Sequence, residues 1–168
     1  MRFRWELLLA LYLLPCISFA GQEKPPHGDV ADAGSLLKVH TFCLDTSPLT
    51  PDQLRDLQRF AAQAGKPKGV FTKLHWQRLD SCSSAEATVI LTMEESERLG
   101  PAGDGTTLQN EAYALKTVRL QQARMLITNR ASGKTLYQAE GGEFTDDREG
   151  AFGSAFSRLL KDLKGLSK

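Results

Sequence analysis

The feature of the sequence that most constrains the fold is a pair of alternating segments between residues 118 and 140. The first places Ala123, Met125 and Ile127 on one side of an extended chain, because successive side chains of a strand point to opposite faces. The sequence NRASG then supplies turn residues, and its Gly133 suits a positive φ. Residues 134–140 alternate in the same way, so the two segments predict a β-hairpin against which the other elements pack.

Two helices are predicted from their own start and stop signals. Over 51–64, Thr50 is a typical N-cap, Pro51 suits the first helical position, and Gln53 completes a capping box. A second helix is predicted over about 147–164, with acidic residues at its start and lysines near its end, the order that the helix dipole favours. Its apolar stripe consists of Phe152, Phe156, Leu159, Leu163 and Leu166.

Three further segments, 36–44, 70–79 and 87–93, are rich in β-branched, aromatic and aliphatic residues and are typical of strands. If the first two share a sheet, the right-handed crossover rule makes them parallel. The order of elements predicts an α+β domain. We expect a two-layer sandwich with two helices on one face of a four- or five-stranded mixed sheet.

The N-terminus has a basic start, an apolar run over 7–17, and small residues before a cleavage point after Ala20. This pattern is typical of a secretory signal peptide over 1–20. Its apolar run is shorter than the ~20 residues that span a bilayer, so no stable membrane insertion is expected after cleavage. An uncleaved N-terminal anchor is the alternative.

Cys16 follows Pro15, where a lipid-attachment site would need a small residue, so ordinary cleavage is favoured over lipid modification. We therefore expect a secreted or periplasmic protein. Residues 21–34 are rich in Pro, Gly and charge and predict a flexible leader. A single α+β domain would occupy 35–168.

Cleavage would leave two cysteines, Cys43 and Cys82. In an oxidising compartment they are expected to form a disulfide. Closing a loop of this length would stabilise the fold by roughly 4 kcal/mol, by restricting the unfolded chain. No C-x-x-C motif is present, so a structural bridge is favoured over a redox role.

The composition is balanced, with 21 Lys and Arg against 20 Asp and Glu. A net charge near zero gives no support to nucleic acid or an anionic membrane as a generic electrostatic partner.

Signals for chemistry are incomplete. The sequence SGKT at 132–135 resembles the end of a phosphate-binding loop, but that motif needs a glycine where Thr128 stands and a helix afterwards. His40 and His75, with Asp45 or Asp80, could form an acid/base or metal pair, yet two histidines are not a complete ligand set. We expect no catalytic residue, metal or cofactor. A soluble small-ligand carrier, or a small hydrolase using His40 and His75, are the alternatives.

Residues 94–111 have little apolar periodicity and predict either a mobile loop or a strand extension that turns at 104–105. Loops of this length are often functional, so Arg98 and Leu99 are candidate partner contacts. Trp76 and Tyr137, on an uncovered sheet face, are further candidates, as is a free sheet edge.

The order of elements, the entry AEA at 85–87 into VILTM, and the hairpin ARMLITNRASGKTLYQAE resemble a group of small exported bacterial envelope domains. These are the LPS-assembly lipoprotein, the curli-secretion lipoprotein and the N-terminal domain of the Tol periplasmic protein. The hairpin of that group often reads like tG.lW, for which this chain has SGKTLY at 132–137. The lipid-attachment cysteine of the lipoproteins is not in place. The resemblance implies a non-enzymatic accessory or binding role at the cell envelope, through contacts with an envelope protein.

Overall fold

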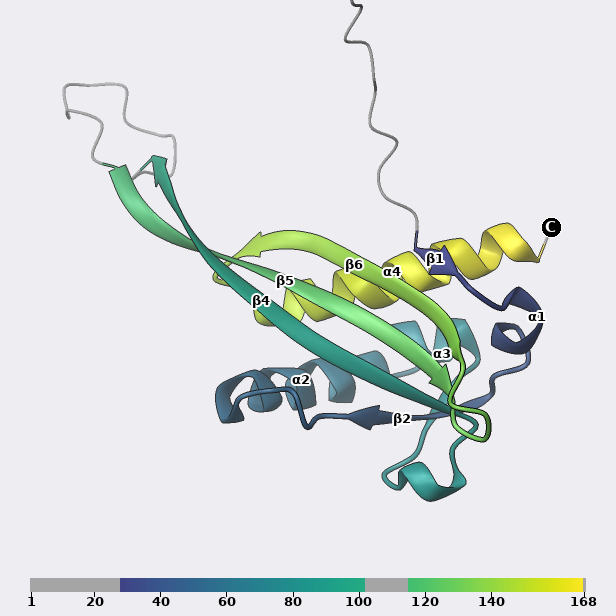
Figure 1. Cartoon of the computed structure of the whole chain (residues 1–168). Coiled ribbons are helices and arrows are strands. Elements are labelled where there is room, and N and C mark those ends of the chain that lie inside the picture. The colour runs from purple at the N-terminus through teal and green to yellow at the C-terminus, as the bar shows by residue number, and fades with distance from the viewer. Residues whose placement is uncertain (1–27, 102–114, 168) are drawn as a thin grey trace, which may run out of the picture.

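The computed structural model describes residues 28–101 and 115–167 (Figure 1). It has the expected α+β class: helices pack against one open, mixed, six-stranded sheet of order β1-β6-β5-β4-β2-β3. The sheet exceeds the predicted four or five strands because two short edge strands, β1 and β3, each add two residues. The elements are β1 (Asp29–Val30), α1 (Ala33–Leu36), β2 (Thr41–Asp45), α2 (Pro51–Ala64), α3 (Val70–Leu74), β3 (Gln77–Arg78), the 3₁₀ turn η1 (Cys82–Ser84), β4 (Ala87–Pro101), β5 (Leu115–Asn129), β6 (Thr135–Thr145) and α4 (Arg148–Leu166).

The predicted hairpin is confirmed as the pair of β5 and β6, in which Ile127 lies opposite Tyr137. Gly133 adopts the positive φ of 68° that its turn requires. The Asn129 side chain accepts hydrogen bonds from the backbone N–H groups of Ala131 and Ser132 at 3.0 and 2.9 Å. These local bonds fix the turn and hence the register of the two strands.

Both long helices form where the sequence predicts them. At the start of α2, Thr50 Oγ1 accepts from the Gln53 N–H at 3.4 Å, and Gln53 Oε1 accepts from the Thr50 N–H at 3.0 Å. This reciprocal pair is the predicted capping box. Asp147 caps α4 by accepting from the Gly150 N–H at 2.8 Å.

The core lies between the helices and one face of the sheet. At its centre, the ring centroid of Phe156 on α4 lies 5.0 Å from that of Phe71 and 5.6 Å from that of Phe60. The Phe42 ring of β2 contacts Phe71 at 5.0 Å in an edge-to-face arrangement, which aromatic pairs favour. These rings join α2, α3, α4 and the sheet into one core.

The prediction of a strand over residues 70–79 is wrong for the first half of this segment, which forms α3. Short apolar runs fit a helix and a strand equally well, and here the helical spacing buries both Phe71 and Leu74. A side chain on Gly69, which begins α3, would place its Cβ 2.0 Å from the Ala64 carbonyl oxygen. The close approach of α2 to α3 therefore requires glycine. The remainder forms β3, which pairs parallel to β2 through Thr41 and Gln77, the orientation that was predicted.

The N-terminal boundaries also differ from expectation. Part of the predicted strand 36–44 belongs to α1, and β2 begins only at Thr41. The predicted leader 21–34 is structured from residue 28, because β1 pairs with β6. Gly28 donates its N–H to Asp162 Oδ2 at 3.0 Å, and the Tyr137 hydroxyl donates to the same oxygen at 2.8 Å. The predicted signal peptide and residues 21–27 lie outside the described residues.

A disulfide joins Cys43 of β2 to Cys82 of η1, as predicted, with their Cα atoms 5.1 Å apart. It ties the parallel edge of the sheet to the turn that enters β4. Among the described residues, no helix is both long and apolar enough to cross a membrane.

Candidate functional site: the projecting hairpin

Strands β4 and β5 continue beyond the elements that support them. They pair from Ala87 opposite Asn129 to Pro101 opposite Leu115. On one side, β2 pairs with β4 only as far as Ile90. On the other side, β6 pairs with β5 only as far as Leu120. Residues 97–101 and 115–119, which we call the arm, therefore form a two-stranded ribbon that leaves the domain (Figure 1).

The apolar core ends at the base of this arm. Along the helix-facing side of β4, Leu91 and Met93 are followed by Glu95. Opposite them on β5, Ala123 is followed by Gln121. Gln121 is 4% exposed, and its Oε1 has no hydrogen-bond partner among the described residues. The change from apolar to polar side chains explains why the helices stop covering the sheet here.

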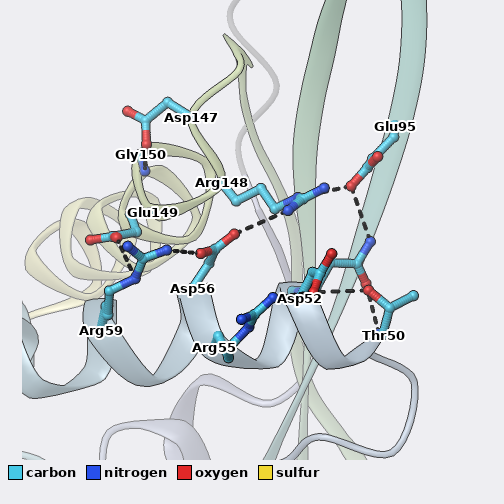
Figure 2. Close-up of polar contacts among 11 residues, drawn as sticks. Thr50, Asp52, Arg55, Asp56, Arg59, Glu95, Asp147, Arg148, Glu149 and Gly150 are labelled. Carbon is cyan, nitrogen blue, oxygen red and sulfur yellow. Dashed lines mark hydrogen bonds and ion pairs between the residues drawn. The ribbon is translucent and has the colours of Figure 1, made fainter.

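Charged side chains close the core at the same level (Figure 2). Arg148, the first residue of α4, donates from Nε to Glu95 Oε1 at 2.9 Å and from Nη1 to Asp56 Oδ2 at 3.1 Å. Arg59 pairs with the other oxygen of Asp56 and with Glu149 at 3.2 Å. Gln53 also donates to Glu95 Oε1, at 3.3 Å. This arm-base network fastens α2, α4 and β4 to one another.

The network holds its carboxylates in the ionised form. Burial raises the pKa of Asp56, but hydrogen bonds from Arg59 and Arg148 outweigh it, so the pKa lies below its ordinary value. Burial likewise raises the pKa of Glu95, and hydrogen bonds from Arg148 and Gln53 bring it below its ordinary value. The arm therefore starts from a rigid, charge-paired base.

The side chains of residues 97–99, 117 and 119 in the arm are exposed. Leu99 is 64% exposed, more than the other exposed large hydrophobic residues of the described ranges, Leu37 at 46% and Leu166 at 39%. Arg98 is also exposed and lies opposite Val118 across the ribbon. The predicted contact residues Arg98 and Leu99 are thus consecutive residues of the exposed arm.

The outer edge of β4 is open over the same stretch. From Leu91 to the end of the strand, no described strand pairs with the side of β4 that faces away from β5. An open edge presents backbone N–H and C=O groups that another chain can pair with.

The alternative of a strand extension for residues 94–111 is confirmed as far as Pro101. The turn predicted at 104–105 lies outside the described residues. The sequence carried a signal for the base of the arm that the prediction missed: past Met93, the helix-facing positions of β4 become polar, beginning with Glu95 and Glu97.

The other two candidate contacts lie inside the protein. Trp76 is 6% exposed and Tyr137 is fully buried, and both belong to the hydrophobic core. The prediction that they line an uncovered sheet face is wrong, because Tyr137 lies on the helix-facing side, where its hydroxyl reaches Asp162. Burial raises the pKa of Tyr137 the most, and the hydrogen bond to Asp162 raises it further.

The alternative enzyme interpretation placed the two histidines on neighbouring strands, but neither histidine lies on a strand. His40 precedes β2, and its Nδ1 lies 3.9 Å from Glu86 Oε2 rather than beside Asp45 or Asp80. His75 ends α3 in a left-handed conformation. Over residues 28–101 and 115–167, no group of three or more His, Cys, Asp or Glu side chains is arranged to hold a metal ion.

No protein-family model and no curated protein matches this chain. Among solved structures, the chain is similar to the PelC dodecamer from Paraburkholderia phytofirmans, with a TM-score of 0.41 and 14% identity over 84% of this chain and 93% of that one. A point variant of the same protein gives a TM-score of 0.41 and 15% identity over 84% and 92%. A likeness at this level does not bear on the function of the present chain.

Proposed function

We propose that this chain is an exported, non-enzymatic accessory protein of the cell envelope that binds another envelope protein through the arm. The observation that carries the proposal is the projection of β4 and β5 beyond their supporting strands, with Leu99 64% exposed on it. A two-stranded ribbon without a packed face is only marginally stable in water. A partner that covered it would supply the burial that the domain itself does not.

The open edge of β4 suggests how such a partner is held. A strand added beside it would pair with the unpaired backbone groups, and pockets for alternate side chains would give specificity. Leu99 would supply apolar contact, and Arg98 a charge that can recognise a carboxylate. The two residues have opposite parity along β4, so they lie on opposite faces of the ribbon.

Export is supported by the disulfide between Cys43 and Cys82, since such bonds persist in oxidising compartments. The signal-peptide pattern of residues 1–20 and the resemblance to small envelope domains agree with it. In this role, the packed half of the molecule acts as a scaffold that holds the arm.

Site-specific photo-crosslinking tests the proposal. A photoreactive amino acid replaces Leu99 in the full chain, which is expressed in its own cells, and crosslinked products are identified from the exported fraction. Leu37 and Leu166 are matched controls, because both are exposed leucines of the helical half. We expect one reproducible product from position 99 and not from the controls. Products from the controls alone would refute binding through the arm.

A further inference from the structure

A second feature lies in the packed half, outside the arm. A cavity of about 740 Å³ opens where the end of α2, α3 and β3 meet. Its floor is apolar and is formed by Ala61, Phe71 and Trp76. Its polar rim includes Lys66 and Arg78. We call this cavity the cationic pocket.

The segment of the chain that lines the pocket contains basic residues and no acidic ones. The sequence contains no Asp or Glu between Asp56 and Asp80, whereas Lys66, Lys68, Lys73 and Arg78 fall in that interval. All four side chains belong to exposed residues. Across the part of the chain that the structure describes, none of the four has a carboxylate within 4.0 Å. Of the four, Lys66 and Arg78 line the cavity, and Lys66 Nζ also donates to Gln63 Oε1 at 3.4 Å. Cations at an open cavity attract anions.

Several cationic side chains near the arm base and on the opposite sheet face are paired with acids. Arg55 pairs with Asp52, Arg124 with Glu94 and Glu140, and Arg148 with Asp56 and Glu95. The balanced composition, which gave no support to an electrostatic partner, therefore hides an uneven distribution of charge. Acids gather near the arm base, whereas the residues between Asp56 and Asp80, which line the pocket, include no acid.

Several carbonyl groups at the end of α2 are already hydrogen-bonded. The Lys66 carbonyl accepts the Gly69 N–H at 2.8 Å and the Thr72 hydroxyl at 2.9 Å. The Ala61 carbonyl accepts the Gly65 N–H at 3.1 Å. The ammonium group of Lys66 and the guanidinium group of Arg78 are the positively charged donors that the rim offers to a ligand.

We propose that the cationic pocket binds the phosphate group of an anionic phosphate ester. Arg78 offers the planar guanidinium that pairs with phosphate oxygens through two hydrogen bonds, and Lys66 offers a compact ammonium charge. The apolar floor receives the carbon skeleton of the ester. Such a phosphate has two sources outside the cytoplasm, the headgroup of an anionic lipid and a free phosphate ester. This site does not depend on the arm, and only the location of its ligand outside the cytoplasm rests on the export proposed above.

Two binding measurements separate the sources. In the first, the purified full chain is sedimented with vesicles of phosphatidylglycerol in phosphatidylcholine, with pure phosphatidylcholine vesicles as reference. In the second, glycerol phosphate is titrated into the protein and followed by NMR at the backbone amides of residues 66–78. Binding to the anionic vesicles alone supports the lipid source, and saturable shifts with glycerol phosphate support the free ester.

Matched variants make the test specific. In Lys66→Glu/Arg78→Glu, we expect binding at least about tenfold weaker, since each cation near an anionic surface contributes a factor of about five. The neutral variant Lys66→Gln/Arg78→Gln is expected to lie between this variant and the parent chain. Lys161→Glu/Lys164→Glu on α4 changes the net charge equally and is expected to bind as the parent does. Circular dichroism checks that each variant is folded.

The proposal is overturned if neither probe binds, or if the α4 variant loses as much binding as the pocket variant. A chain whose arm has been shortened is expected to keep full phosphate binding. Failure of the pocket is therefore distinguishable from failure of the arm.

Discussion

The same two strands behave differently at their two ends. Where helices cover them, β4 and β5 bury Val89, Leu91 and Ile127 completely. In the arm, the strands keep their pairing, but Leu99 is 64% exposed. Both regions thus share backbone pairing between β4 and β5, but only the packed region buries one face of the strands. Since burying a leucine contributes about 1.5–3 kcal/mol, the packed half holds the stability of the fold and the arm contributes little.

The transition between the two regions is abrupt because polar residues occupy the last covered positions. Gln121 and Glu95 replace apolar side chains on the helix-facing side, and Arg148 closes the gap from α4. A longer apolar stripe would have required longer helices to cover it. The two strands of the arm can therefore extend beyond the helices, because they have no apolar face that the helices would need to cover.

Breaking the packed half should have the largest effect. Phe156→Ala removes a fully buried ring that contacts Phe42, Phe60 and Phe71. We expect the free energy of unfolding to fall by about 3–5 kcal/mol, through lost burial and the cavity left behind. Urea unfolding followed by circular dichroism measures it. Leu99→Ala on the arm is the matched control, with an expected change within about 0.5 kcal/mol, and equal losses at the two positions would contradict the comparison.

Removing the crosslink of the packed half should have the next effect. The double substitution Cys43→Ala/Cys82→Ala opens a loop with a sequence separation of 39 residues. We expect a loss of roughly 4 kcal/mol, by restoring freedom to the unfolded chain. Thermal unfolding of the variant and of the reduced parent chain should agree. A variant as stable as the oxidised parent would show that the disulfide does not stabilise the fold.

The boundary between the regions should respond to Arg148→Leu, which leaves Glu95 without its arginine. We expect a loss of about 1–2 kcal/mol at neutral pH, as for hydrogen bonds between charged groups. Asp56 and Glu95 have folded-state pKa values below their ordinary values. Their contribution is therefore present above the unfolded-state pKa and is lost as the pH falls through the folded-state pKa.

The difference in stability between the parent chain and Arg148→Leu should consequently begin to shrink near pH 4, the ordinary pKa range in which these carboxyl groups become protonated in the unfolded chain, and should shrink further as the pH falls through their lower folded-state pKa values. Urea unfolding across pH 3–7 measures this. Arg124→Leu, which breaks an exposed ion-pair triad on the other sheet face, is the control, and its expected effect is within about 1 kcal/mol. A difference for Arg148→Leu that does not vary with pH would contradict the role given to the network.

Shortening the arm should have the smallest effect on stability. Residues 97–119 are replaced by a short turn containing Asn-Gly, so that Ser96 and Leu120, which already face one another, become the last pair. We expect the free energy of unfolding to change by no more than about 1 kcal/mol, because the arm lies beyond the last described pair of β6. Thermal unfolding tests this, and a loss of several kcal/mol would place the arm within the folding core.

Predictions from the sequence succeeded where the determining interactions are local. The capping box at Thr50 and Gln53, the turn at Gly133 and the alternation of the hairpin all involve residues close in sequence. The pairing of Cys43 with Cys82 could also be predicted, because the expected cleavage leaves no other cysteine.

Predictions failed where tertiary packing decided the outcome. The run VFTKL became α3 because the packing of Gly69 against Ala64 and the burial of Phe71 select a helix. Tyr137 was expected at a surface, yet Asp162 and Gly28, distant in sequence, bury it. The arm was foreseen only as one of two alternatives, since the points at which β2 and β6 stop pairing depend on the whole sheet. The uneven charge at the cationic pocket was hidden by the near-zero net charge.

The most direct test of the arm as the binding site is competition. The chain with the photoreactive group at position 99 is mixed with the exported fraction of the cells that express the protein and with an excess of unlabelled competitor. The yield of the crosslinked product is then measured. Unlabelled full-length chain is expected to abolish the product, whereas folded chain with the shortened arm is expected to leave the yield unchanged. Equal competition by the two chains would show that the partner binds the packed half, and would contradict the assignment of binding to the arm.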